Sequence, residues 1–177
     1  MCGIREETRF RELAEGTHIN IFILDADPIR AARMQCNKHV VKMIVEAAQL
    51  LTTPFPAGVA PYRRTHANHP CAKWIQQSLA NYRWTVLHAL TLCEEYTKRY
   101  GKTHKTEAVI DWFLHNEPNI AKRKLTPFAR CIKEPWKAQS IHLPVVEAYR
   151  HYYVEDKARF AKWAPRANAP DWWPFKE

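Results

Sequence analysis

Four polar side chains recur at helical spacing in the segment after Pro28, and they are His39, Lys42, Glu46 and Gln49. Residues three or four apart share one face of an α-helix, so an imidazole, an ammonium group, a carboxylate and an amide would lie together. This set suits general acid–base catalysis, with His39 as acid or base and Glu46 as its partner. The alternative is a solvated helix face on which Lys42 and Glu46 form an ion pair.

Two aspartates, Asp25 and Asp27, precede the same segment. Carboxylates at the start of a helix accept hydrogen bonds from its free N–H groups, and Asp27 has the better position because Pro28 follows it. Asp25 is then not needed as a cap, and we count it as a further candidate catalytic carboxylate.

Histidines and cysteines in two stretches are of types that zinc accepts. The first stretch is Cys36-x-x-His39, and the second is His66-x-x-His69-x-Cys71. No CxxC pair accompanies them, so we expect neither a metal nor another cofactor, and metal-dependent hydrolysis remains a third functional alternative. The five cysteines are an odd number, which argues against a disulfide framework and favours a reducing compartment, the cytoplasm.

The loop before Pro70 is basic and polar. We expect its side chains to contact phosphates and a displaced base, and they are Arg63, Arg64, His66, Asn68 and His69. The structural alternative for two of them is that Asn68 or His69 caps the helix that starts at Pro70.

A second basic run covers residues 96–105 and mixes lysines and an arginine with tyrosines. Arg99, Lys102 and Lys105 are candidates for phosphate contacts there, as are Lys38 and Lys42 on the first helix. Basic residues at a helix end are also favoured by the helix dipole, which accounts for part of this signal.

The overall charge agrees with such contacts. Lysine and arginine number 27 against 18 acidic residues, a formal net charge of +9. An excess of this size favours a polyanionic partner, most simply DNA, with RNA as the alternative. No apolar run approaches the roughly 18 residues of a membrane span, so we expect no membrane partner. The oligomeric state is not indicated.

The expected elements are mostly helices. Apolar periodicity predicts a helix from Pro28 to about Thr53, a second from Pro70 to a C-cap at Gly101, a third over 106–116 and a last over 144–163. Residues 19–24 are β-branched and aromatic, which fits a strand or a buried extended lead-in. We therefore predict a mainly α, compact, single-domain helical bundle over 17–177, with one short N-terminal extended segment and an arm over 1–16.

Residues 17–21, Thr-His-Ile-Asn-Ile, resemble the mature start of the phage endonuclease V type of pyrimidine-dimer DNA glycosylase. The helix after Pro28, the Asn68-His69-Pro70 step and the helix ending at Gly101 resemble, in order and spacing, the related phage and bacterial proteins. The similarity covers residues 17–105.

The resemblance implies a compact helical DNA-repair enzyme that flips a base and performs base excision. In that family the α-amine of an N-terminal threonine attacks the sugar carbon, and a glutamate on the first helix assists the lyase step. By position, Thr17 would supply the amine, but sixteen residues precede it, so the chain would have to be processed or to start there. The glutamate position falls near Lys38 or His39, and Glu46 is the nearest acid on the same helix.

Two readings of different class therefore stand at this point. One is a glycosylase and lyase with Thr17, His39, Glu46 and Asp25 as catalytic candidates. The other is a non-catalytic nucleic-acid-binding protein that uses the same basic surface.

Overall fold

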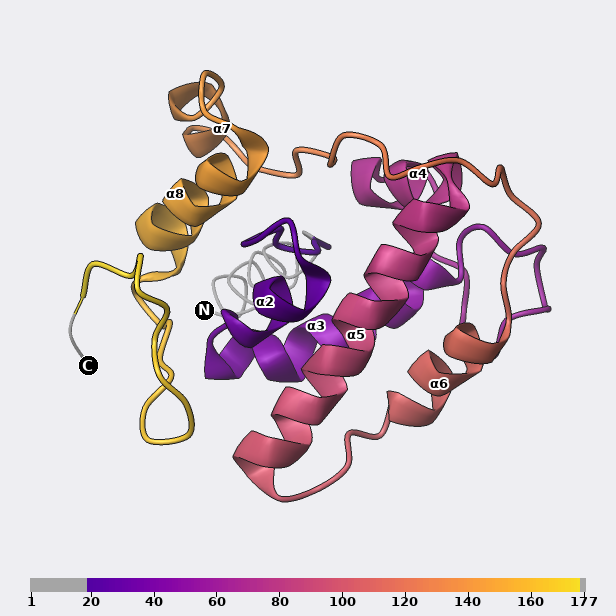
Figure 1. Cartoon of the computed structure of the whole chain (residues 1–177), viewed down its shortest axis with the longest axis horizontal. Coiled ribbons are helices and arrows are strands. Elements are labelled where there is room, and N and C mark those ends of the chain that lie inside the picture. The colour runs from indigo at the N-terminus through magenta and orange to yellow at the C-terminus, as the bar shows by residue number, and fades with distance from the viewer. Residues whose placement is uncertain (1–18, 176–177) are drawn as a thin grey trace, which may run out of the picture.

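The computed structural model describes residues 19–175, and helices are the only regular elements in that part of the chain (Figure 1). They are α2 (Pro28–Arg33), α3 (Asn37–Leu51), α4 (Pro70–Gln77), α5 (Leu79–Tyr100), α6 (Glu107–His115), α7 (Trp136–Gln139) and α8 (Val145–Lys157). The predicted mainly helical fold is confirmed. None of these helices is long and apolar enough to cross a bilayer.

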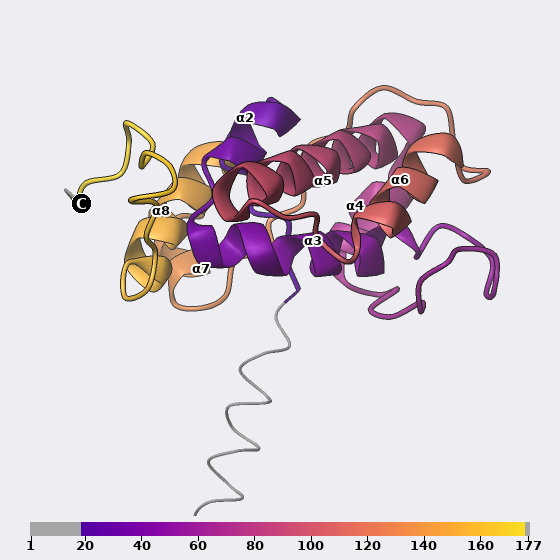
Figure 2. The same ribbon diagram turned by 90° about the horizontal axis from the view of Figure 1, so that it is seen from below.

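Helix α5 is the centre of the packing. It contacts α2, α3, α4 and α6, whereas α7 and α8 pack on each other at one end of the molecule (Figures 1 and 2). Buried apolar side chains form a cluster that runs from Ile19 to Trp173. The C-terminal tail packs back onto the body, because Trp173 is buried and its ring lies 6.3 Å from that of Tyr153.

The prediction of one long helix after Pro28 is wrong, because the chain breaks between α2 and α3. Tertiary partners take over the backbone groups at the break. The Cys36 N–H donates to the Tyr153 hydroxyl at 3.0 Å. The Arg99 guanidinium donates to the carbonyl oxygens of Arg33 at 3.1 Å and Gln35 at 2.8 Å. Neither a glycine nor a proline marks this break in the sequence.

The predicted second helix is also divided, at Ser78, into α4 and α5. The Ser78 hydroxyl accepts from the Asn81 N–H at 3.1 Å, and the Asn81 amide donates to the Trp74 carbonyl at 2.7 Å, so both sides of the break are capped. The end of α5 is as predicted, since Gly101 adopts the left-handed conformation with φ of 68°. Helix α6 is confirmed, and α8 is shorter than expected because it ends at Lys157.

Residues 19–24 are extended and buried, but they form no strand. Their backbone groups bond to side chains instead. The Gln35 amide donates to the Ile21 carbonyl at 3.1 Å, and the Asn20 N–H donates to a carboxylate oxygen of Glu46 at 2.8 Å. Of the two interpretations of this segment, the extended lead-in is correct.

Candidate active site

Glu46 lies on the buried face of α3, and its side chain is fixed at both oxygens. Oε2 accepts the Asn20 N–H, and Oε1 lies 3.1 Å from Nζ of Lys42. Burial raises the pKa of the Glu46 carboxyl, although Lys42 and the Asn20 N–H oppose this effect. The expected Lys42–Glu46 ion pair is therefore present, but the carboxylate is only 5% exposed and not part of a solvated face.

His39, two turns earlier on α3, has a buried imidazole. Its Nδ1 lies 2.7 Å from the Tyr153 hydroxyl, and its ring stacks on Phe22 with a centroid distance of 4.5 Å. Burial lowers its pKa well below the usual value, and nearby positive charges add to this effect. The lysines concerned are Lys157, Lys42 and Lys38.

Phe22 borders the same site from the extended segment. Its φ of 59° is in the left-handed region, which costs an aromatic residue on the order of 1–3 kcal/mol. The side-chain oxygen of Asn20 holds this bend by accepting the N–H groups of Ile21 at 2.8 Å and Phe22 at 3.1 Å. The Phe22 ring also meets Tyr153 edge-on at 5.5 Å. The strained segment therefore orders the aromatic surroundings of the imidazole.

Helix α8 contributes charged groups that sequence reasoning did not select. The Asp156 carboxylate lies 2.6 Å from Nζ of Lys157 and 3.1 Å from Nζ of Lys133. The pKa of Asp156 is lowered by these lysines, because their effect outweighs its partial burial. A sequence signal for Lys157 was present, because residues 149, 153 and 157 follow each other at four-residue spacing and therefore share one face of the helix.

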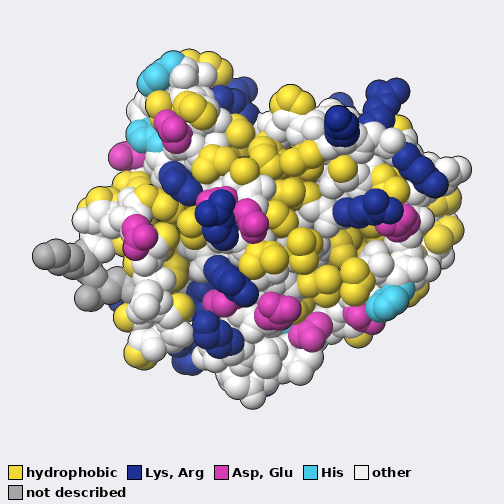
Figure 3. Space-filling model, viewed as in Figure 1, with side chains coloured by type: hydrophobic (Ala, Val, Ile, Leu, Met, Phe, Trp, Pro, Cys, Tyr) yellow, Lys and Arg dark blue, Asp and Glu magenta, His cyan; other side chains and the backbone are white. Residues whose placement is uncertain are grey.

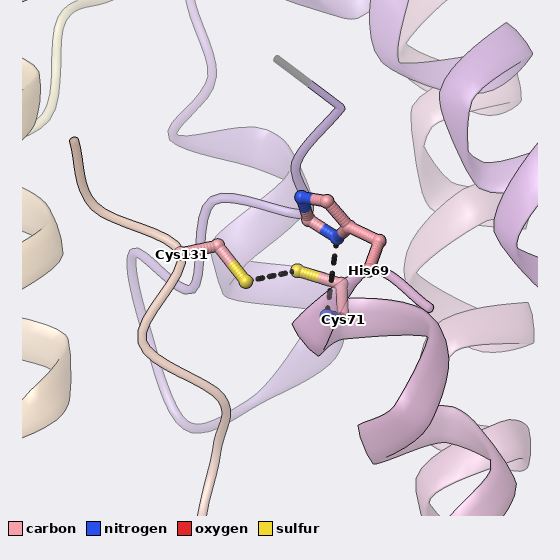
Figure 4. A group of neighbouring side chains, drawn as sticks. All are labelled: His69, Cys71 and Cys131. Carbon is pink, nitrogen blue, oxygen red and sulfur yellow. Dashed lines mark hydrogen bonds between the residues drawn. The ribbon is translucent and has the colours of Figure 1, made fainter. Parts of the chain in front are cut away.

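A cysteine pair and a histidine lie next to the start of α4 (Figure 4). The sulfur atoms of Cys71 and Cys131 are 2.7 Å apart, and Nδ1 of His69 accepts the Cys71 N–H at 3.2 Å. Burial raises the pKa of Cys71, whereas the hydrogen bond from Cys71 lowers that of Cys131. One ligand atom from each of the three residues lies within 4.8 Å of the others, so this group could hold a metal ion.

This group differs from the one that the sequence suggested. Cys131, some 60 residues further along the chain, replaces Cys36 and His39, which lie together at the start of α3. The cysteine pair adjoins the extended segment, because the Cys131 carbonyl accepts from the Asn20 amide at 2.7 Å. His69 is the N-cap of α4, so the structural alternative for this residue is confirmed.

Several expected nucleic-acid contacts are exposed in the structure. In the loop before α4 these are Arg63, Arg64, His66 and Asn68. After α5 they are Lys102 and Lys105. On α3, Lys38 is exposed and lies over the Phe160 ring at 4.6 Å from its centroid, and Lys42 is exposed beside Glu46.

Arg99 is not such a contact, because its side chain is 0% exposed and is bound to Glu95 on the same helix at 2.8 Å. The expectation of a phosphate contact is wrong for this residue, which instead closes the break between α2 and α3.

Asp25 is bound to groups that hold α2 and α8 together. Its carboxylate accepts the Asp27 N–H at 2.9 Å and pairs with Arg30 at 3.2 Å and Arg150 at 3.4 Å. Asp27 caps α2 as predicted. These contacts favour a structural role for Asp25. Thr17, the expected nucleophile, lies outside the described residues.

The face shown in Figure 3 carries lysine and arginine side chains interspersed with acidic ones and with a broad hydrophobic area. The positive charge on this face is therefore not gathered into a single patch. Next to His39, by contrast, three lysines are close enough to affect one imidazole.

Comparison with known families gives one match. A family model described as pyrimidine dimer DNA glycosylase matches residues 19–108, just over half of the chain. The matched region holds the extended segment, α2 to α5, His39 and Glu46. Comparisons with curated proteins and with solved structures gave no significant match.

Proposed function

Because the chain belongs to the pyrimidine dimer DNA glycosylase family, we propose that it excises dimerised pyrimidines from DNA by glycosylase and lyase steps on a flipped base. One observation carries this proposal. The buried Glu46 carboxylate on α3 accepts the Asn20 N–H at 2.8 Å, so an acid on this helix lies against the extended segment at the start of the matched region.

Glu46 is proposed as the acid and base of the reaction. Its raised pKa brings proton exchange closer to neutral pH than for an exposed glutamate. After an imine forms at C1′ of the sugar, the carboxylate would remove a C2′ proton, and the 3′ phosphate would leave. The hydrogen bond from Asn20 and the ion pair with Lys42 hold the carboxylate in place for this step.

His39 is proposed as a neutral partner of Glu46. The Tyr153 hydroxyl accepts the Cys36 N–H and can donate its own hydrogen to Nδ1 of His39, which places the imidazole proton on Nε2. The lowered pKa keeps the ring uncharged at working pH. A neutral imidazole can donate a hydrogen bond to a flipped base or its sugar without adding positive charge.

The exposed basic residues are proposed to bind the DNA backbone. Lys38 and Lys42 lie beside the site, so they would contact phosphates near the flipped nucleotide. The loop residues Arg63 and Arg64 would contact the duplex further away. Such contacts position the DNA without selecting the sequence, which suits an enzyme that recognises damage.

The decisive experiment compares ultraviolet-irradiated duplex DNA with the same duplex before irradiation. Pyrimidines in a dimer are joined to each other, so a base cut from its own sugar stays attached to its neighbour. The assay should therefore measure sugar aldehydes and strand cleavage rather than free base. We expect both products only from irradiated DNA, and their absence would overturn the proposal.

The same experiment separates the other candidate functions. A non-catalytic binder would hold the duplex in a salt-dependent way and leave its glycosidic bonds intact. A metal-dependent hydrolase would lose its activity with a chelator and regain it with a divalent metal.

A further inference from the structure

Lys157 on α8 has a largely buried amine next to the candidate active site. Its side chain is 12% exposed. The Nζ atom lies 2.6 Å from Asp156 Oδ2 and 3.4 Å from the Tyr152 hydroxyl. It also lies over two aromatic rings, 4.8 Å from the centroid of Tyr152 and 5.5 Å from that of Phe22. Phe22 in turn stacks on His39, so the amine and the imidazole border the same ring.

The buried position of Lys157 favours the neutral form of its amine more than the surroundings of a surface lysine would. Burial lowers the pKa of the amine, Lys133 and Arg159 lower it further, and Asp156 opposes them. On the facing helix α3, His39 and Glu46 both respond to the charge of Lys157.

The two carboxyl groups of the site have opposite pKa shifts. The pKa of Glu46 is raised by burial, whereas that of Asp156 is lowered by its lysine partners. A pair of this kind can divide the work of acid and base between them. Asp156 stays ionised, and its hydrogen bond of 2.6 Å fixes the position of the Lys157 Nζ atom.

We propose that the ε-amine of Lys157 is the nucleophile that attacks C1′ of the damaged nucleotide and forms the imine. The proposal rests on the glycosylase function proposed above. Like the α-amine that the family resemblance implies, a lysine amine can form an imine with C1′.

The lone pair of the neutral amine forms a bond to C1′ while the C1′–base bond breaks, and the base leaves with that electron pair and takes one proton of the amine. The second amine proton moves to O4′ as the C1′–O4′ bond opens, which gives the imine. Water then hydrolyses the imine, releases an aldehyde at C1′ and restores the amine.

The test is borohydride trapping on irradiated duplex, followed by proteolysis and mass spectrometry of the cross-linked peptide. Borohydride reduces the imine to a stable amine, so the attacking nitrogen is identified in the unmodified chain. Two variants extend the test: Lys157→Ala removes the amine, and Lys157→Arg keeps the positive charge. The matched control is Lys122→Ala, which removes an exposed lysine of the segment after α6.

We expect the cross-link on Lys157, its loss by at least 100-fold in both Lys157 variants, and its retention in the control. A cross-link on Thr17 or any other residue, or aldehyde formation without a cross-link, would overturn this inference and leave the glycosylase function standing. If irradiated DNA yields neither aldehyde nor cleavage, the proposed function fails, and the inference fails with it. Mapping in the unmodified chain decides the question even if a variant does not fold.

Discussion

Arg99 and Lys157 are both largely buried basic side chains, but they are bound in different ways. The difference distinguishes a side chain that stabilises the fold from one that can take part in a reaction. Arg99 uses all five of its N–H donors, on Glu95, Asn37 and the carbonyl oxygens that end α2. Lys157 has Asp156 and Tyr152 as hydrogen-bonding partners and lies against aromatic rings. The Arg99 guanidinium, whose N–H groups are all hydrogen-bonded, stabilises the backbone around it. The Lys157 amine has fewer partners and lies among aromatic rings, so it can react.

The largest effect should follow from breaking the saturated cluster. Arg99→Ala leaves Glu95 buried without its partner and frees the carbonyl groups between α2 and α3. We expect the free energy of unfolding to fall by about 3–5 kcal/mol, measured by urea denaturation. The control is Arg83→Ala, which removes an exposed ion pair with Glu117 and should leave the free energy of unfolding nearly unchanged. Equal losses would show that the Arg99 cluster is not structural.

A second substitution tests the chemical side of the comparison. Glu46→Gln keeps the size of the side chain and an acceptor for the Asn20 N–H, but it removes the titrating proton. We expect aldehyde formation on irradiated DNA to fall about 100-fold, which is about 2.7 kcal/mol of activation free energy. Stability and DNA affinity should change little. The control is Glu94→Gln, on the exposed side of α5, and a similar rate for both variants would exclude Glu46 from catalysis.

Lowering the pH should destabilise the fold, because His88 is a buried imidazole with a structural role. His88 stacks on Trp84 and lies 3.2 Å from the Gln35 amide, and burial lowers its pKa to about 3. The unfolded chain therefore takes up this proton first as the pH falls. Stability is lost from about pH 6.5 downward, by about 1.4 kcal/mol per pH unit for this group.

His88→Gln should reduce that slope by the same amount, measured by urea unfolding between pH 4.5 and 6.5. His39, whose pKa is also lowered, contributes in the same direction and retains its share in the variant. An unchanged slope in His88→Gln would contradict the assignment.

The smallest effect is expected in the exposed loop before α4, which contacts neither Arg99 nor Lys157. Arg63→Ala and Arg64→Ala should each weaken DNA binding several-fold without changing the preference for irradiated DNA. The slope of log affinity against log salt should become less steep by about 0.9 for each lost phosphate contact. Fluorescence anisotropy at several salt concentrations measures this. Arg83→Ala should leave the slope unchanged. If all three variants have the same slope as the unmodified protein, the loop does not contact the DNA.

Local sequence signals accounted for a definite part of this molecule. The helix cap at Asp27, the left-handed Gly101 and the apolar periodicity are short-range features, so they predicted the start of α2, the end of α5 and the segments that are helical. The spacing of His39 and Glu46 correctly placed both on α3. The resemblance over residues 17–105 agrees with the family match over 19–108.

Only the tertiary structure decided what those side chains meet. Asn20 bonds to Cys131 across 111 positions, and His39 meets Tyr153 across 114. Contacts between residues far apart in the sequence also stabilise the break before Asn37, bury Arg99 and place the Phe22 ring next to Lys157. Sequence spacing describes one face of one helix, whereas burial and pKa depend on groups that other elements bring to that face. The helical segments and the candidate acid were therefore visible in the sequence, whereas the burial of Lys157, the candidate nucleophile, was not.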